Sequence, residues 1–444
     1  MRLHRERSLS IHGPRKRAAI TAIVSAALLV TTVASFADAS TAWTSRDPRV
    51  INQWNKIGVD LIVGTSTIGG TARAFNYFAY QQAAVYNAVQ GITRRYQLYQ
   101  WSRLGPRTAS PAAAAAAAAH RILVHYFPGS AATLNASYAA TLAKLPLIGK
   151  AAGKRYGEAA AANIIELRAH DGLGDPSVTF NIPVGPGVWR GQGSPPQAFL
   201  APWLSQMHPF TLNSTSQFDP GPPPDMTSAV YTADWNEVKA KGSATASLAD
   251  RSAHDTETAR FFFDTAAAPL QAGLRDLAWR HHLDISDSAR MFAAVDLSIA
   301  DAVGAVWYAK VKYGFWRPIS AIRLADTDGN PATMPDTTWT PLIANPPYPD
   351  WVSGLCSVYG AAGRALRRVI GSDIDLRITS PGTAAGGPLG VPITRTYHSA
   401  TVMNTDAINA RVFSGIHFRF ADVGGTQIGI KAANWALDHN FGRN

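Results

Sequence analysis

Apolar residues recur at spacings of three and four along most of the chain, which is typical of helices that bury one face. Ser110-Pro111 before Ala112–Ala119 supplies an N-cap, a first-turn proline and a run of strong helix formers. Alternating β patterns are scarce, so we predict an all-α fold, a helical bundle with long Pro/Gly-rich loops. The other predicted helices span 50–63, 71–89, 145–169, 228–241, 251–266, 269–282, 286–313 and about 353–370.

Residues 171–225 interrupt this pattern with 11 prolines and many glycines, a density that excludes regular elements. The segment also carries large aromatic residues, so we expect an ordered wrap packed on the helices and not a linker between domains. Shorter loops are expected at 325–349 and 379–390. We therefore predict a single domain over 40–444, with its catalytic part at about 285–440.

The first 39 residues have the layout of a secretory signal. Basic residues up to Arg17 precede an uncharged apolar run over 18–37, and Ala37-Asp38-Ala39 offers a small-x-small cleavage pattern. The alternative is an uncleaved anchor, because the apolar run is long for a signal. Cleavage predicts a secreted or extracytoplasmic protein without a membrane segment, since no later stretch approaches 18 uninterrupted apolar residues.

The composition of the chain limits which kinds of site and partner it can have. The chain is 46% hydrophobic and 16% charged, as expected for a globular protein. Cys356 is the single cysteine, which excludes an intrachain disulfide and a cysteine-based metal cluster. The net charge of +11 favours small anionic partners. A nucleic-acid partner is not expected, because no basic stripe is interleaved with aromatic residues.

Three segments carry candidate chemistry. In the first, Lys310 and Arg317 are seven residues apart, so both side chains would point to one side if the helix continued up to Pro318. An ammonium and a planar guanidinium together suit a tetrahedral oxyanion. Taken alone, such a pair is more often a solvated helix face, but the aromatic neighbours Tyr313 and Trp316 favour burial.

The second segment, Ser353-Gly354, follows a Pro-rich loop and begins a helix. A hydroxyl and free backbone N–H groups at a helix start can bind an anion, although an ordinary serine N-cap has the same sequence. In the third segment, Arg411 and His417 are six residues apart, about 120° on a straight helix. They would converge only through a bend, which Gly415 could provide.

Together, Lys310-x6-Arg317-Pro318, Ser353-Gly354 and Arg411-x3-Gly415-x-His417 resemble the three-part signature of the vanadium-dependent haloperoxidases and type 2 phosphatidic acid phosphatases. The order and the gaps of roughly 40–60 residues fit as well. Further similarity to the bacterial, phosphatase-like haloperoxidase branch covers most of residues 45–442. It is carried by Val50-Ile-Asn-Gln-Trp-Asn, Tyr86-Asn87, Gly187-Val-Trp189-Arg190 and Pro346-Pro-Tyr-Pro.

The resemblance implies a helical bundle with a bound vanadate, for which phosphate competes. It implies that His417 bonds to vanadium, or attacks phosphorus in a phosphatase. It further implies that the anion's oxygens are held by Lys310, Arg317, Arg411, the Ser353 hydroxyl and the Gly354 N–H. The implied small-molecule partners are hydrogen peroxide, a halide and an organic acceptor, or a phosphate ester. Homo-oligomer formation stays open.

The sequence departs from the family pattern at two positions. The family usually has a histidine directly after Ser-Gly, where this chain has Leu355, which can neither donate nor accept a proton. His398, Asp350 and Cys356 are candidate substitutes, although Asp350 could instead cap the next helix. The family often has an acidic residue four after the metal-bonding histidine. Here that position is alanine, and Asp422 follows it, so Asp422 would miss the histidine.

The leading interpretation is a haloperoxidase-like enzyme that oxidises halide with hydrogen peroxide at a histidine-bound vanadate. One alternative is a secreted acid phosphatase that uses the same residues through a phosphohistidine intermediate. The other is a non-catalytic homologue that binds oxyanions but has lost the proton-transferring histidine.

Overall fold

The computed structural model describes residues 42–444 apart from 66–71, 264 and 383–390, and these residues form one unit. The predicted signal at 1–39 lies outside the described residues. Helix accounts for 56% and strand for 4%, which confirms the all-α fold. The helices are α1 (Arg49–Gly64), α2 (Ala74–Thr93), α3 (Pro111–Tyr126), α4 (Ala131–Lys144), α5 (Lys150–Leu167), α6 (Ala229–Lys241), α7 (Ala253–Phe263), α8 (Ala268–Arg280), α9 (Ile285–Tyr313), α10 (Pro318–Arg323), α11 (Gly354–Val369), α12 (Ala400–Phe413) and α13 (Arg419–His439).

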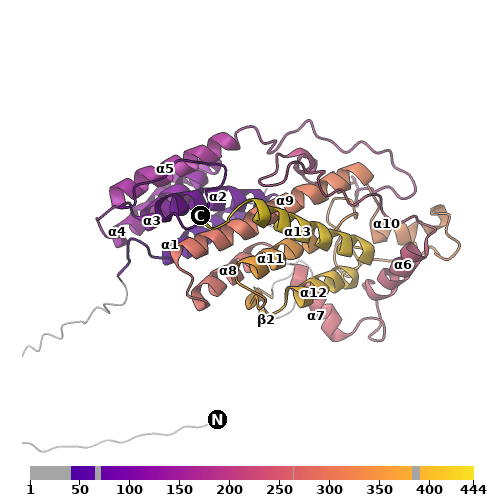
Figure 1. Cartoon of the computed structure of the whole chain (residues 1–444). Coiled ribbons are helices and arrows are strands. Elements are labelled where there is room, and N and C mark those ends of the chain that lie inside the picture. Colours follow the sequence, from indigo (N-terminus) through magenta and orange to yellow (C-terminus); the bar gives the residue numbers. More distant parts are fainter. Residues whose placement is uncertain (1–41, 66–71, 264, 383–390) are drawn as a thin grey trace, which may run out of the picture. The chain divides into compact units, whose positions relative to one another are not determined.

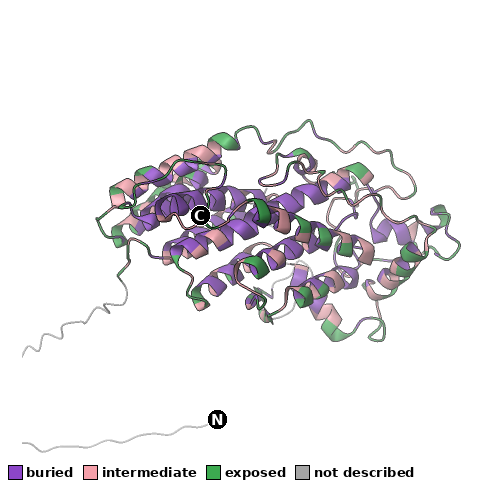
Figure 2. Ribbon diagram, in the orientation of Figure 1, coloured by how far each residue is buried: buried purple, intermediate pink, exposed green. Residues whose placement is uncertain are grey.

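The long helix α9 is the centre of the bundle. It packs against α2 on one side and against α11 and α13 on the other, so it joins the N-terminal helices to the C-terminal ones (Figure 1). Almost all of its residues are buried (Figure 2). It is long and apolar enough to cross a membrane, but 94% of its apolar window is buried inside the protein, as in a core helix.

Close packing explains the alanine run of α3. Ser110 caps the helix by accepting a hydrogen bond from the Ala113 N–H at 3.2 Å, as predicted. Residues 112–119 are all buried. Gly153 and Gly157 of α5 face the α3 backbone so closely that a Cβ at either position would collide with a carbonyl oxygen of 110 or 114. Small residues on both helices therefore allow α3 and α5 to approach.

The Pro-rich segment 171–225 contains no α-helix or strand and has one short 3-10 helix, η3 (Pro202–Gln206). The buried carboxylate of Asp301 on α9 accepts hydrogen bonds from three backbone N–H groups of this segment, those of Phe210 at 2.6 Å, Thr211 at 2.7 Å and Leu212 at 3.1 Å. A segment without regular structure must satisfy its backbone in this way when it packs on a core. Elsewhere in the described residues, η2 (Pro128–Ser130) and η4 (Ala325–Thr327) are also 3-10 helices.

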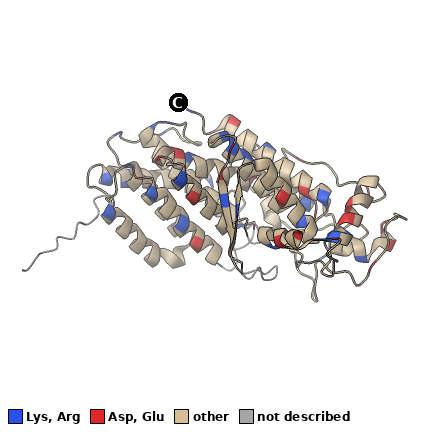
Figure 3. Cartoon of the chain, turned by 90° about the horizontal axis from the view of Figure 1, so that it is seen from below, with Lys and Arg blue, Asp and Glu red and all other residues tan. Residues whose placement is uncertain are grey.

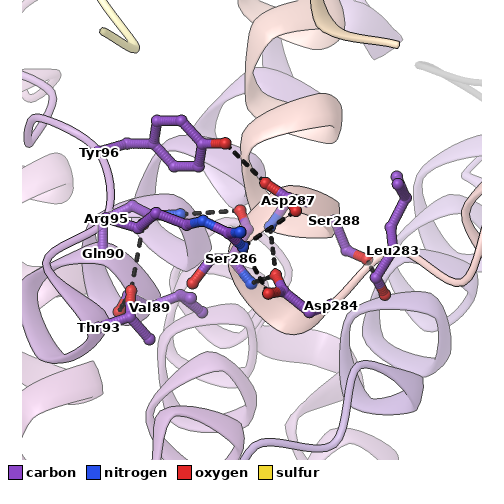
Figure 4. A network of polar contacts seen from close by, with 10 residues as sticks. All are labelled: Val89, Gln90, Thr93, Arg95, Tyr96, Leu283, Asp284, Ser286, Asp287 and Ser288. Carbon is purple, nitrogen blue, oxygen red and sulfur yellow. Dashed lines mark hydrogen bonds and ion pairs between the residues drawn. The ribbon is translucent and has the colours of Figure 1, made fainter. Parts of the chain in front are cut away.

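A polar network fastens the start of α9 to the end of α2 (Figure 4). Asp284 caps α9 by accepting the N–H groups of Ser286 and Asp287, both at 2.9 Å. Arg95 forms ion pairs with Asp284 and Asp287, and the Tyr96 hydroxyl donates to Asp287 at 2.6 Å. This network fixes the end of α9 opposite to the one that carries Lys310.

The prediction of an irregular loop over 379–390 is wrong for its first residues, which belong to a strand. Strands β1 (Leu376–Ser380) and β2 (Ile393–Tyr397) form an antiparallel hairpin, with Leu376 opposite Tyr397. Residues 376–380 alternate between buried and exposed, so β1 lies with one face on the bundle, next to α8. The rest of the predicted loop, 383–390, lies outside the described residues.

Basic and acidic residues are interspersed over the helices in the view of Figure 3, without a continuous stripe of one sign. Among the described residues, several basic side chains at the surface pair with acidic ones, as Lys56 does with Asp60 at 2.5 Å. The cations of the predicted site are buried instead, and they are described next.

Candidate functional site

Lys310 and Arg317 are both buried, but they do not share one helix as the sequence suggested. Gly314 adopts a left-handed conformation (φ 55°) and ends α9, and Arg317 is extended just before α10. The turn brings the two side chains together where a straight helix would have kept them nearly two turns apart. The Lys310 ammonium donates to the carbonyl oxygens of Pro349 at 2.6 Å and Asp350 at 3.0 Å.

Backbone carbonyls hold the Arg317 guanidinium in place. Its Nε donates to the Tyr348 oxygen at 2.8 Å and its Nη1 to the Ile416 oxygen at 2.6 Å. Nη1 also lies 3.0 Å from Nε2 of His417. Nη2 is buried and has no hydrogen-bond partner among the described residues, so one donor of this rigid fork is free for an anion.

Ser353 occupies the N-cap position of α11, but its hydroxyl makes no capping hydrogen bond. The hydroxyl is fully buried and lies beside Asp422 and Cys356, whose pKa values it lowers, and this position argues against an ordinary N-cap. The Ser353 N–H donates a hydrogen bond to the carbonyl oxygen of Ala421 at 2.9 Å. The Gly354 N–H is the first of the helix, and the positive end of the helix dipole favours an anion there.

The predicted bend between Arg411 and His417 is present. Helix α12 ends at Phe413, Gly415 has φ 76°, and a Cβ at that position would collide with the Gly242 carbonyl oxygen. The bend places His417 in the connection to α13, 1% exposed, beside Arg317. Arg411 is also buried, and its Nε has no partner among the described residues.

The structure thus brings together all six predicted residues, and we call them the oxyanion seat: Lys310, Arg317, Ser353, Gly354, Arg411 and His417. Three cations in a buried site are costly unless negative charge balances them, and Asp350 and Asp422 are the carboxyl groups beside them. The seat has the composition that a tetrahedral oxyanion requires.

Asp350 contributes a function that sequence reasoning missed. Its Oδ1 lies 2.7 Å from Nδ1 of His417, and both side chains are almost completely buried. The contact is close but bent, since it does not meet the angle of a directed hydrogen bond. Asp350 is therefore neither a helix cap nor a group facing the anion; it sits behind the imidazole. The two residues are 67 positions apart, and no local pattern connects them.

Burial and charge set the protonation of this pair. Burial raises the pKa of Asp350 to about 7, against the opposing effect of Arg317 and Lys310. Burial, together with the cations Arg317, Lys310 and Arg411, holds the pKa of His417 well below its usual value. The ring is therefore neutral, and the carboxyl behind it assigns the ring proton to Nδ1. The Nε2 lone pair then faces the cations.

Burial also lowers the pKa values of the cations, that of Lys310 well below its usual value and that of Arg317 to about 10. Each cation is destabilised first by the loss of water and then, for Lys310, by the neighbouring guanidinium. An anion placed among them would reverse the repulsion between like charges and raise these pKa values.

The other acid/base candidates lie elsewhere. His398 is at the surface, 66% exposed, where it pairs with Asp373 at 2.9 Å, so the structure does not bring it to the seat. Cys356 is buried with its Sγ 3.4 Å from Oδ1 of Asp422, and burial raises the pKa of both groups. Asp422 misses His417, as expected, and lies instead on the Ser353 side of the seat.

A cavity of about 480 Å³ opens onto the seat at Gly354 and Arg411. Leu355, which is partly exposed, forms part of its wall together with Trp307, Tyr348 and Val358. Small molecules would reach the anion through this cavity. Leucine thus occupies a position that faces the reaction space.

Comparison with known proteins supports this description. Residues 290–442 match the family of the VCPO second helical-bundle domain. A vanadium chloroperoxidase from Curvularia inaequalis is 27% identical over 197 residues, a match that covers 35% of this chain and 32% of that protein. The matched region therefore spans about a third of that relative's length.

Solved structures extend the likeness to nearly the whole fold. The structure of a bacterial vanadium-dependent iodoperoxidase superimposes with a TM-score of 0.72 at 21% identity, covering 89% of this chain and 97% of that one. A holo-type bacterial vanadium-dependent chloroperoxidase gives a TM-score of 0.67 at 16% identity, with coverages of 87% and 96%.

The C-terminal part of the chain thus matches the family of the VCPO second helical-bundle domain, and the fold of nearly the whole chain is that of the vanadium haloperoxidases. The matched region, 290–442, contains all six residues of the oxyanion seat and Asp350. This haloperoxidase-like protein departs from the family signature at Leu355, in the wall of the cavity.

Proposed function

We propose that this protein binds vanadate through His417 and oxidises a halide with hydrogen peroxide. The observation that carries the proposal is the imidazole of His417, whose unprotonated Nε2 faces buried cations while Asp350 holds Nδ1. A neutral ring nitrogen beside buried cations can give its lone pair to an electron-poor centre whose surrounding groups are anionic. Vanadate would fit such a site, because its metal centre can bind a ring nitrogen and its oxygens can accept hydrogen bonds.

The donors of the seat fit this group. Arg317 Nη2 and Arg411 Nε are buried and without partners among the described residues, so two donors are available to vanadate oxygens, and the Ser353 hydroxyl beside Asp422 could add a third. Lys310 adds a buried charge. The described residues contain no cluster of three or more His, Cys, Asp or Glu side chains that could hold a bare cation. The metal would therefore enter as an oxyanion.

Bound vanadate supplies a Lewis acid that activates hydrogen peroxide for attack by a halide, with the balance X⁻ + H2O2 + H⁺ → HOX + H2O. The chain provides the rest. His417 would ligate through Nε2, Asp350 would keep the ring proton on Nδ1, and the cations would stabilise negative charge on the oxygens in a buried site.

Phosphate ester hydrolysis is the competing reaction at such a site. It requires His417 as nucleophile and a proton for the departing alkoxide. Leu355 provides no proton at the position that faces the cavity. The relatives named above are peroxidases, and their names support halide oxidation as the reaction of this family member.

Vanadium binding tests the proposal directly. We expect the purified protein, incubated with orthovanadate and desalted, to retain one vanadium per chain by elemental analysis and to oxidise halide when peroxide is added. His417→Ala removes the only direct ligand and should abolish retention while the helical circular dichroism spectrum persists. His398→Ala, at an exposed histidine, is the matched control and should retain vanadium. Equal vanadium content in both variants would refute the assignment of His417.

A further inference from the structure

The positive charge of this protein is concentrated in one part of the chain. Residues 61–157 contain ten Lys and Arg residues and no Asp or Glu, whereas the rest of the chain holds 31 basic and 30 acidic residues. The stretch includes α2, α3, α4 and the first part of α5, which lie together at one end of the bundle (Figure 1). A part of the molecule with charge of a single sign attracts polyanions.

Two apolar side chains project from the same region, in the connection between α4 and α5. Leu147 and Ile148 are 85% and 84% exposed, the highest values among the large apolar side chains of the described residues. Leu145, two residues earlier, is buried in the core. The connection is held in place because Gly149 adopts a left-handed conformation and its carbonyl accepts the Ser110 N–H at 3.0 Å. A fixed turn thus presents an adjacent apolar pair to the surroundings.

Basic side chains lie around this apolar pair. Lys144 is exposed at the end of α4, and its ammonium lies 5.1 Å from the centre of the half-buried Trp43 ring. Arg107 is exposed next to Thr108, and a Cβ on Gly149 would lie 2.3 Å from the Thr108 carbonyl oxygen. Neither Lys144 nor Arg107 forms an ion pair with a carboxylate of the described residues, so both charges face outward without compensation.

We propose that this end of the bundle docks on the surface of an anionic phospholipid bilayer. The docking surface, which we call the basic apolar tip, consists of Trp43, Arg107, Lys144, Leu147 and Ile148. Docking is peripheral and needs no membrane span. It is also independent of the chemistry at the oxyanion seat, whose cations lie in the C-terminal part of the chain.

A bilayer surface offers both kinds of contact that the tip can make. The headgroup layer carries negative charge that attracts Lys and Arg, and its boundary with the acyl chains accepts apolar side chains. Trp43 beside Lys144 suits the same layer, because amphipathic rings concentrate at membrane interfaces.

Other partners would use only one of these features. A nucleic acid or an acidic polysaccharide would pair with the cations but would gain nothing from two exposed aliphatic side chains. A second copy of the chain could cover Leu147 and Ile148, but it would bring like charges together, which opposes self-association. The combination of charge and apolar exposure therefore favours a lipid surface.

Sedimentation of the full chain with lipid vesicles tests the apolar part of the tip. We expect binding to vesicles of phosphatidylcholine and phosphatidylglycerol, and loss of that binding as salt rises or when phosphatidylcholine is used alone. Leu147→Ser together with Ile148→Ser should weaken binding to the mixed vesicles at least about tenfold, because two apolar side chains no longer leave water. Leu248→Ser with Val402→Ser changes two apolar side chains that are exposed elsewhere and should bind like the wild type.

A second pair of substitutions tests the charge. Arg107→Gln with Lys144→Gln should weaken binding to the mixed vesicles roughly 25-fold at low salt, because each cation near an anionic surface contributes about fivefold. Arg377→Gln with Lys431→Gln removes two exposed cations outside this end of the bundle and is the matched control. Equal losses in the two pairs would show that net charge alone matters, and the tip would be rejected as the docking surface.

A probe on the tip reports its own docking even if the predicted N-terminal apolar run over 18–37 also enters the bilayer. The native Cys356 is buried, so Ile148→Cys provides an accessible thiol for an environment-sensitive fluorophore. We expect its emission to shift to the blue when anionic vesicles are added. The same fluorophore on Leu248→Cys, at another exposed position, should show no shift.

Three results would overturn the proposal. The first is an unshifted fluorophore at position 148 together with vesicle binding that the two serines leave unchanged. The second is binding to heparin without binding to anionic vesicles, which would assign the cations to a soluble polyanion. The third is self-association that the two serines abolish, again without vesicle binding, which would assign the tip to a second copy of the chain. Circular dichroism checks that each variant is folded.

Discussion

The carboxylate of Asp350 lies 2.7 Å from Nδ1 of His417, on the side of the ring opposite to Arg317. The carboxylate and the guanidinium thus fix the orientation of the imidazole from its two nitrogens. Asp350 is itself anchored through its backbone, whose N–H donates to the Phe315 oxygen at 2.9 Å and whose carbonyl accepts from Lys310. One residue therefore connects the ligand histidine with a cation of the seat.

Asp350→Asn should weaken vanadate binding by about 10–100-fold, the usual cost of losing the partner of a ligating histidine. The amide cannot favour the Nδ1 tautomer as a carboxylate does, so Nε2 is less available to the metal. Equilibrium dialysis with vanadate measures this loss without any turnover. Asp373→Asn disrupts the exposed pair with His398 and is the matched control. Equal vanadate affinity in the two variants would show that Asp350 does not orient His417.

Leu355→His should raise the rate of halide oxidation, because a positioned acid or base contributes about 10²–10⁴-fold and the wild type lacks one at this place. Vanadate affinity should change little, since the fixed cations hold the anion. Steady-state kinetics on vanadate-loaded protein measures the effect. His398→Ala should keep the wild-type rate, given its exposed position. A fast wild type that Leu355→His fails to accelerate would mean that another group transfers the proton.

Gly415→Ala should destabilise the protein and reduce vanadium retention. A left-handed conformation costs a non-glycine residue about 1–2 kcal/mol, and here the new Cβ also collides with Gly242. Gly174 has the same φ of 76° but nothing within 4 Å of a Cβ, so Gly174→Ala carries the backbone cost alone. Urea denaturation should show a larger loss of stability for Gly415→Ala. Equal losses would show that the Gly242 contact is unimportant.

Asp296 should make stability depend on pH. It is fully buried on α9 with the Gln271 amide as its partner, and burial raises its pKa to about 8. The Asp296 carboxyl ionises near pH 4 in the unfolded state and near pH 8 in the folded state. The free energy of unfolding should therefore fall as pH rises across this window.

Asp296→Asn removes that titration. The free energy of unfolding of the variant, relative to that of the wild type, should rise by on the order of 3 kcal/mol between pH 5 and pH 8, because each pKa unit is worth about 1.36 kcal/mol. Urea denaturation at both values measures the difference, with Asp438→Asn on the surface as control. A constant difference between variant and wild type across the window would show that Asp296 does not titrate there.

The sequence alone predicted most of the helices and named the six residues that we call the oxyanion seat. Helical periodicity is a local property, and the bend at Gly415 could be predicted because glycine alone adopts its conformation without strain. The resemblance to a family selected His417 and its partners from many buried polar residues. Cleavage after residue 39 and export stay predictions, because they concern residues outside those described.

Tertiary structure alone decided the rest. The contact between Asp350 and His417 joins a loop before α11 to the connection before α13, and such contacts depend on how distant elements pack. The same packing leaves Arg317 Nη2 buried and without a partner among the described residues, which distinguishes it from a surface cation. Leu355 could be recognised in the sequence as a missing histidine, but only the tertiary structure shows that it forms part of the wall of a cavity, because residues from several separate helices line that space.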